Sequence, residues 1–150
     1  MSAKLTVSED VTLVTLYNAP SDMNFIAMVF EDIAEMNIDI DMIALSPLQG
    51  SKASVSFTIK DDDLMTLLGY TSKLKAKGIK PVVSSGNSII SISDDSMEEN
   101  PGVAAKIFRA IATSEADIRI VTTSQVQVSV LVTAAVFEQA YSALKNCLNS

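Results

Sequence analysis

The chain has 150 residues, of which 48% are hydrophobic, so it can bury the core of one domain or of two small ones. Its formal net charge of −7 argues against a nucleic-acid-binding face, and the absence of histidine excludes His-based triads and His-containing zinc sites. Because Cys147 has no second cysteine to pair with, and no signal peptide or membrane-length apolar run is present, we expect a cytoplasmic protein without a disulfide.

The first half of the chain alternates strand and helix patterns. Strict alternation of polar and apolar residues predicts strands, and apolar residues three or four positions apart predict helices. The first expected elements are strands at 4–7 and 11–17 with a break at 8–10, a loop at 18–24, and a helix with Ile26, Val29 and Ile33 on one side. A strand at 38–43, a turn at 47–52 and a strand at 53–59 follow. This half ends with a helix at 61–77, a strand at 80–83 and a turn or linker at 84–87.

The second half begins with a strand at 88–93 and a polar loop. A helix then opens with Asn100, Pro101 and Gly102. Proline is tolerated in the first helical turn, and glycine lets a backbone or a ligand approach closely. The free N–H groups of such a turn can bind a carboxylate. We expect a second strand that ends at 122–124, a strand at 126–132 and a helix at 134–149.

The two halves form an internal repeat. When the chain is shifted by 78 residues, 24–43 aligns with 102–121 and the apolar positions of the two helices coincide. The identical pairs are Ala27/Ala105, Phe30/Phe108, Ile33/Ile111, Ala34/Ala112, Asp39/Asp117 and Ile40/Ile118. The sequence therefore predicts two units of the same β-α-β-β-α plan.

The second unit lacks the closing strand that 80–83 provides for the first. An unpaired sheet edge is unfavourable, and the spare strand at the N-terminus can cover it. We therefore expect a first unit at 11–86, inserted into a second unit made of 87–150 and the closing strand 3–8. The alternative is a disordered N-terminus.

A family resemblance rests on two stretches of the second unit. The first, residues 100–108, reads Asn-Pro-Gly-Val-Ala-Ala-Lys-Ile-Phe, and the second runs from Ala116 to Val132 through Thr122-Thr123-Ser124-Gln125. With the tandem repeat, they resemble the ACT-domain pair of the aspartokinase regulatory region. The resemblance implies an α+β fold of two ferredoxin-like βαββαβ units. Each would have an antiparallel four-stranded sheet with helices on one face, and the first unit would be inserted in the second.

The resemblance also implies a function. Such modules bind an amino acid, typically lysine or threonine, and pass inhibition to a kinase domain. No phosphate-binding loop precedes the first unit, so we expect a regulatory module without kinase activity that forms a homodimer and acts on a partner enzyme of amino-acid biosynthesis. The alternative is an ACT scaffold or dimerisation protein without an effector. Met23-Asn24 in place of the family's Pro-Gly, and Leu45 in place of a glutamine, favour that alternative.

The candidate site follows from the chemistry of a free amino acid. Backbone N–H groups at a helix start can hold its carboxylate, while a carboxylate or carbonyl oxygens can hold its ammonium group. The effector-binding candidates are Asp22, Asn24, Phe25, Ile26, Asp41, Asn100, Gly102, Val103, Ala104, Thr122, Thr123, Ser124 and Gln125.

Structural roles compete with these assignments. Asp22 suits a helix N-cap, Asp41 a solvated strand face, and residues 122–124 a turn. Residues 100–102 can serve packing alone. The acidic runs at 61–63 and 94–99 fit helix starts better than a metal site. We expect no metal, cofactor or catalytic residue.

Overall fold

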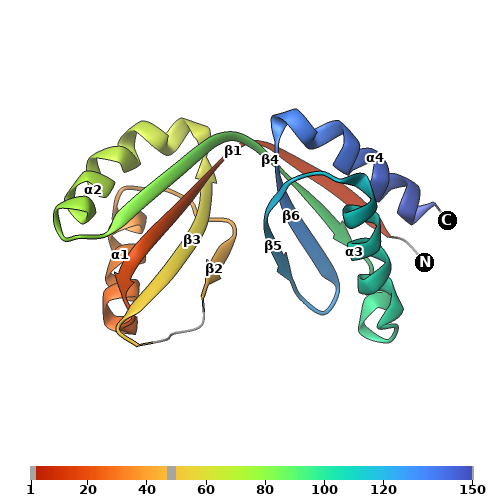
Figure 1. Cartoon of the computed structure of the whole chain (residues 1–150), viewed down its shortest axis with the longest axis horizontal. Coiled ribbons are helices and arrows are strands. Elements are labelled where there is room, and N and C mark those ends of the chain that lie inside the picture. Colours follow the sequence, from red (N-terminus) through yellow and green to blue (C-terminus); the bar gives the residue numbers. More distant parts are fainter. Residues whose placement is uncertain (1–2, 47–49, 150) are drawn as a thin grey trace. The chain divides into compact units, whose positions relative to one another are not determined.

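The computed structural model describes residues 3–46 and 50–149, and within them the chain forms an α+β fold with six strands and four α-helices (Figure 1). The chain divides into two compact units. The first unit is Asp10–Ser85, and the second unit is Met1–Glu9 together with Gly86–Ser150. Each unit has its own sheet segment and its own pair of helices (Figure 1).

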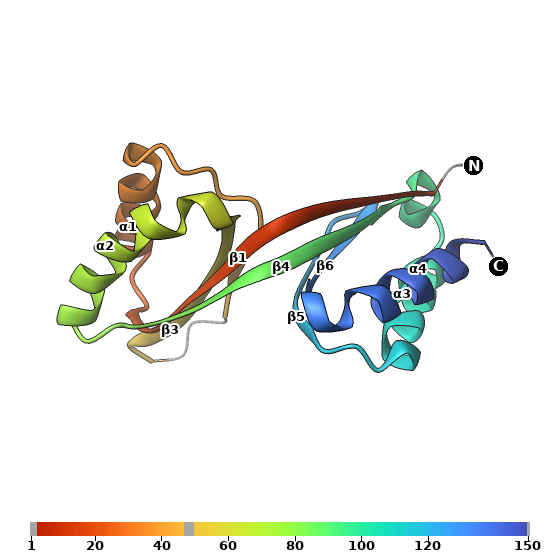
Figure 2. The ribbon, with the colours of Figure 1, turned by 90° about the horizontal axis from the view of Figure 1, so that it is seen from above.

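The sheet of the first unit has the strand order β2-β3-β1-β4. Its elements are β1 (Lys4–Pro20), α1 (Met23–Glu35), β2 (Ile43–Leu45), β3 (Lys52–Lys60), α2 (Leu64–Ala76) and β4 (Lys80–Ser93). A 3₁₀ turn at Asp61–Asp63 leads into α2. β3 runs antiparallel to both of its neighbours, with Phe57 opposite Val14 on β1 and Ile43 on β2. The helices α1 and α2 run next to each other on one side of the strands (Figure 2).

The core of the first unit lies between this sheet and the two helices. Alternate residues of β3, namely Val55, Phe57 and Ile59, are buried as period-two patterning predicts. They pack in one cluster with Ile33 of α1 and Leu67 of α2. The 3.6-residue period of each helix therefore places one apolar stripe on the sheet and leaves its other face in water.

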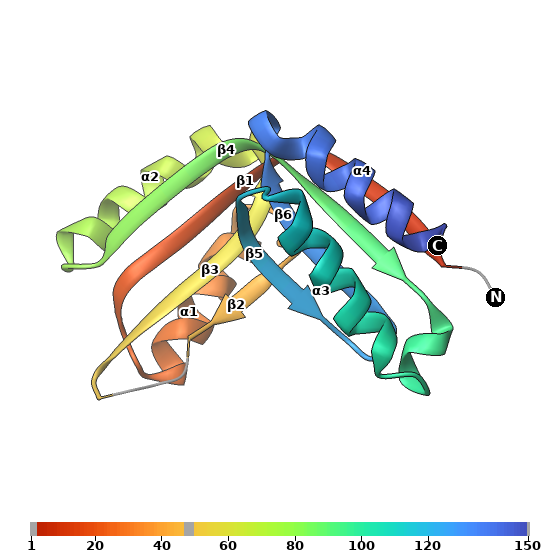
Figure 3. The same ribbon diagram turned by 45° about the vertical axis from the view of Figure 1, so that its right-hand side comes forward.

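The second unit repeats the plan with the strand order β1-β4-β6-β5 (Figure 3). Its further elements are α3 (Gly102–Ser114), β5 (Ile118–Thr123), β6 (Gln127–Thr133) and α4 (Phe137–Leu148). β6 is antiparallel to β4 and β5, with Val130 opposite Ile90 and Val121. A separate buried cluster joins these strands to Ile107 of α3 and Leu144 of α4.

Two expected breaks are absent, because β1 and β4 are continuous strands. The sequence predicts an interruption at 8–10 and a turn at 84–87, but β1 runs through Asp10 and β4 runs through Gly86. Both residues have left-handed backbone angles, with φ of 57° and 74°. Aspartate and glycine tolerate this conformation better than most residues, so the chain can change direction locally without leaving the strand.

Other strand bounds also differ from the prediction. β1 extends past residue 17 to Pro20 through a register shift between Leu16 and Ala19, where Asn18 has φ of 62°. β2 covers only Ile43–Leu45 instead of 38–43. Before β2, the Met42 N–H donates to the Thr58 hydroxyl at 2.8 Å, so a side-chain bond replaces part of the regular ladder. Residues 47–49 of the expected turn at 47–52 lie outside the described residues.

Candidate functional site

The start of α1 carries four of the candidate residues. Asp22 is the N-cap, and its carboxylate accepts a hydrogen bond from the Asn24 N–H at 3.0 Å. The N–H groups of Phe25 and Ile26 donate to the Asp22 carbonyl at 3.0 and 3.1 Å. Asp22 therefore satisfies the main-chain donors of this turn. A ligand carboxylate here would have to replace these bonds.

The structure separates Asp41 from that turn. The Ser21 N–H donates to the Ser51 carbonyl at 3.0 Å, which places the α1 turn beside the beginning of β3. The Asp41 N–H donates to the Thr58 carbonyl at 3.1 Å, near the end of β3. From Ser51 to Thr58 an extended strand spans roughly 23 Å. Within the first unit, Asp41 and Asp22 thus lie at opposite ends of the same strand.

The start of α3 in the second unit is built by Asn100. Its side-chain oxygen accepts from the Gly102 N–H at 3.1 Å, and its carbonyl accepts from the Val103 N–H at 3.2 Å. A Cβ on Gly102 would come within 3.3 Å of the Asn100 side-chain oxygen, so a glycine fits best here. Val103 and Ala104 are half-buried, and Val103 packs against the core. At this turn, the polar groups of Asn100 and Gly102 therefore precede apolar residues, of which Val103 packs against the core.

The polar candidates 122–125 lie at the same end of the second unit's sheet as the α3 turn. Thr122 and Thr123 end β5, and the Ser124 N–H donates to the Gln127 carbonyl at 2.8 Å to close the β5–β6 hairpin. The loop that leads to α3 touches this hairpin, since the Asp94 N–H donates to the Val126 carbonyl at 2.8 Å. Ser124 and Gln125 are exposed. The second unit thus brings two of the predicted motifs to one edge.

Asp94 is a polar residue of this edge that the sequence interpretation placed only among helix-start charges. It is 6% exposed and caps a 3₁₀ turn by accepting hydrogen bonds from the Ser96 hydroxyl at 2.7 Å and the Ser96 N–H at 2.9 Å. These bonds stabilise the carboxylate and lower the pKa of Asp94. The Asp-x-Ser spacing was the available sequence signal.

Sequence comparisons show that the chain is similar to ACT domains and to aspartokinases. An ACT-domain family model matches residues 90–148. The aspartokinase of Bacillus sp. (strain MGA3) is 30% identical over 140 residues, which are 91% of this chain and 34% of that protein. Aspartokinase 2 of Bacillus subtilis (strain 168) is 30% identical over 128 residues, covering 83% of this chain and 31% of that protein. The chain spans about a third of the length of these relatives.

Structural comparison extends the likeness to both units. The ligand-free regulatory subunit of aspartate kinase from Thermus thermophilus has a TM-score of 0.86 and 28% identity over 95% of each chain. The aspartate kinase of Synechocystis has a TM-score of 0.88 and 28% identity over 97% of this chain and 26% of that one. The chain resembles the tandem ACT-domain regulatory region of aspartokinase. The ACT-domain match lies within the second unit and includes the Asn100 turn and the 122–125 hairpin.

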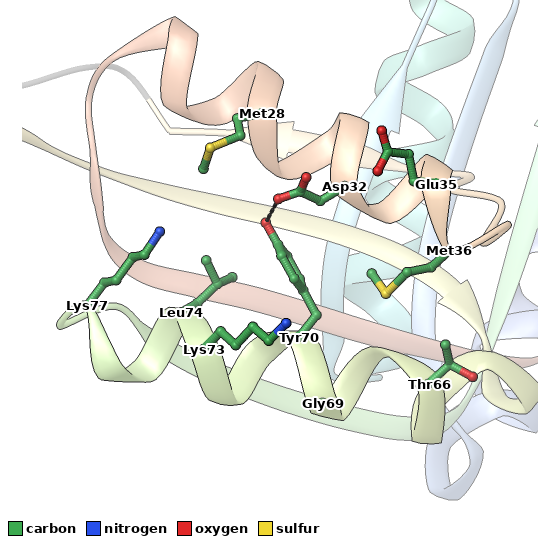
Figure 4. A pocket seen from close by; sticks show the side chains of 10 residues that line it. All are labelled: Met28, Asp32, Glu35, Met36, Thr66, Gly69, Tyr70, Lys73, Leu74 and Lys77. Atoms are coloured by element: carbon green, nitrogen blue, oxygen red, sulfur yellow. Dashed lines mark hydrogen bonds between the residues drawn. The ribbon is translucent and has the colours of Figure 1, made fainter.

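The first unit also contains a groove that the sequence interpretation did not predict. It has a volume of about 660 Å³ and lies between α1 and α2 (Figure 4). Its lining residues are Met28, Asp32, Glu35, Met36, Thr66, Gly69, Tyr70, Lys73, Leu74 and Lys77. The Tyr70 hydroxyl crosses from α2 and donates to the Asp32 carboxylate at 2.8 Å (Figure 4).

Opposite charges line the two walls of this groove. Asp32 and Glu35 come from α1, whereas Lys73 comes from α2 and Lys77 directly follows the end of α2. No ion pair within 4.0 Å joins these four side chains, all of which belong to the described residues. Partial burial, followed by the hydrogen bond to Asp32 and its negative charge, raises the pKa of Tyr70 above its ordinary value. The sequence signal was the i,i+3 acidic pair on one helix and the i,i+4 lysine pair on the other.

The described part of the chain has neither a metal-ligand cluster nor a helix that could cross a membrane. There, no group of three or more His, Cys, Asp and Glu residues is arranged to hold a metal ion. The acidic run at 61–63 instead forms the 3₁₀ turn before α2, where Asp61 accepts from the Thr12 hydroxyl at 2.6 Å. None of the described helices is long and apolar enough to cross a membrane.

Proposed function

We propose that the chain is an amino-acid-binding allosteric regulatory module of the aspartokinase type, with lysine or threonine as its effector and no catalytic residue of its own. The observation that carries this proposal is the fold likeness of the chain to a regulatory subunit of aspartate kinase. The likeness extends over nearly the full length of both proteins. Effector binding would stabilise one state of the module, and a partner aspartokinase would respond to that state.

The second ACT unit supplies the favoured effector site. The α3 turn at Asn100 and Gly102 lies at the positive end of the helix dipole, and an effector carboxylate bound there would replace the hydrogen bonds that Asn100 accepts from the Gly102 and Val103 N–H groups. The exposed Ser124 and Gln125 at the same edge offer hydroxyl and amide groups to the rest of the effector. In the first unit the corresponding turn begins at Asp22, which likewise accepts hydrogen bonds from the N–H groups of Asn24, Phe25 and Ile26.

We also propose the inserted arrangement, in which each unit is ferredoxin-like and residues 3–8 close the sheet of the second. Three observations support it. β1 lies next to β4 in the strand order, Met1–Glu9 group with Gly86–Ser150 as one compact unit, and Leu5 packs against the second unit's core.

A homodimer is part of the same proposal. Its support is the edge strand β2, where Ile43 and Leu45 are 51% and 40% exposed. Apolar residues on an open strand edge favour pairing with a second copy. Sedimentation velocity should show a dimer that shifts toward monomer in an Ile43→Lys variant. A monomer at every concentration would refute the dimer.

A thermal-shift screen against the proteinogenic amino acids at millimolar concentration tests effector binding. An effector present at about a hundred times its dissociation constant stabilises the folded chain by roughly 2.7 kcal/mol. We expect lysine or threonine to raise the melting temperature. An Asn100→Ala variant should lose the shift, whereas the control Asn146→Ala, on α4, should keep it. No shift with any amino acid would favour the ACT scaffold instead, for which Met23 and Leu45 argue.

A further inference from the structure

We propose that the groove between α1 and α2 binds a small zwitterion with an apolar body, of about the size of a dipeptide. Its ammonium group would lie against Asp32 and Glu35, and its carboxylate against Lys73 and Lys77. This site shares no residue with the effector candidates at the helix starts and strand ends. It therefore does not rest on the proposed regulatory function.

The opposite charges of the two groove walls favour a zwitterionic ligand. Each wall has one sign, and no ion pair joins these four described side chains across the groove. The Tyr70 hydroxyl binds one oxygen of Asp32 at 2.8 Å and holds that carboxylate at the groove (Figure 4). A purely anionic ligand would meet two carboxylates, and a purely cationic one would meet two ammonium groups. A zwitterion complements both walls at once.

The apolar lining and the dimensions favour an apolar body between the two charges. Met28, Met36 and Leu74 line the groove, and methionine side chains adapt to varied apolar shapes. The volume of about 660 Å³ is in the ordinary range for small-ligand pockets. Two extended residues span about 7 Å, which sets the charged ends of a dipeptide far enough apart to face opposite walls.

The test is a titration of the full chain, labelled with ¹⁵N, with the dipeptide leucyl-leucine. We expect saturable chemical-shift changes in α1 and α2, including Asp32, Glu35, Lys73 and Lys77. N-acetyl-leucyl-leucine lacks the ammonium group and leucyl-leucine amide lacks the carboxylate. Each blocked peptide should bind about three- to tenfold more weakly, because one charged contact is lost.

Matched variants separate the groove from general surface charge. Lys73→Gln and Glu35→Gln should each weaken leucyl-leucine binding about threefold or more. Lys75→Gln and Glu31→Gln remove the same charges from exposed positions of the same helices that do not line the groove, and should leave binding unchanged. Asn100→Ala should also leave it unchanged, which separates this site from the effector site.

Three results would overturn the proposal. The first is the absence of saturable shifts in α1 and α2 with leucyl-leucine. The second is equal binding of the free and both blocked peptides. The third is an equal loss of affinity in the groove variants and in their matched controls.

Discussion

Tyr70 joins the two helices of the first unit with a single hydrogen bond to Asp32. Tyr70→Phe should lower the free energy of unfolding by about 1 kcal/mol at neutral pH, because it removes that bond from a part-buried site. Urea denaturation measures the change, with Tyr17→Phe as the control because Tyr17 is 46% exposed. An equal loss in the two variants would mean that the bond does not stabilise the fold.

The same bond has a pH dependence with a defined sign. The pKa of Tyr70 is raised in the folded state, mainly by burial and then by Asp32. The stability that the protonated Tyr70 hydroxyl contributes is fully present below the ordinary tyrosine pKa of about 10. It is lost as the pH rises toward the folded-state pKa. Ultraviolet titration of the phenols should show one tyrosine that ionises late, and this late step should be absent in Tyr70→Phe. Persistence of the late step would assign it to another residue.

Asp94 is expected to act in the opposite pH range. The two hydrogen bonds from Ser96 lower its pKa, so its stabilisation is present above the ordinary aspartate pKa of about 4 and is lost as the pH falls through the folded-state value. Asp94→Ala should lower the melting temperature at pH 7, and the gap from the parent chain should narrow in acid. Asp95→Ala changes an exposed neighbour and should have little effect. A gap that stays constant down to acid pH would contradict this role.

At the scale of the element, one glycine within α2 and one just after its end have opposite expected effects. Gly78 follows the helix end with φ of 87°, where its N–H donates to the Lys75 carbonyl at 3.0 Å. Gly78→Ala should cost about 1 kcal/mol, because an L-residue is strained there. Gly69 lies within the helix with open space around its Cβ position, so Gly69→Ala should stabilise by about 0.5–1 kcal/mol. Thermal unfolding of both variants measures the two changes in stability. Two changes of the same sign would contradict this account.

The helix α1 was predictable from the sequence because it carries a complete amphipathic period. The apolar stripe of α1, with Ile26, Val29 and Ile33, is buried as its spacing predicts. Strand continuity was less predictable. Asp10 and Gly86 are typical turn residues with left-handed backbone angles, yet β1 and β4 run through them as neighbours in the sheet. Local composition does not report that pairing between strands.

The features of the candidate sites likewise differ in how far the local sequence predicts them. The role of Asp22 as an N-cap, one of its two sequence interpretations, depends on local spacing and is present in the structure. The separation of Asp41 from Asp22 depends on the length of β3, and the groove depends on which faces of α1 and α2 meet. These features depend on tertiary contacts between residues that are distant in the sequence.

At the scale of the whole molecule, the chain has two hydrophobic cores and no shared one among the described residues. One core gathers Val14, Phe57 and Ile33, and the other gathers Ile90, Val130 and Ile107. Because each cluster lies within one compact unit, a substitution in one core should act mainly on that unit. The beginning of β1, up to Glu9, is informative here, because it precedes the first unit in sequence but groups with the second.

Removing residues 1–9 should therefore destabilise the second unit more than the first. The deletion exposes the edge of β4 and removes Leu5 from the core of the second unit. Hydrogen exchange followed by mass spectrometry should show faster exchange in β4, β6 and α3, with α1 and β3 little changed. Leu5→Asp should reproduce part of the effect, at about 1–2 kcal/mol, because it places a charge against apolar side chains. The control Val7→Asp alters a 37% exposed residue of the same strand. Unchanged protection of the second unit after the deletion would refute its closure by the N-terminal strand.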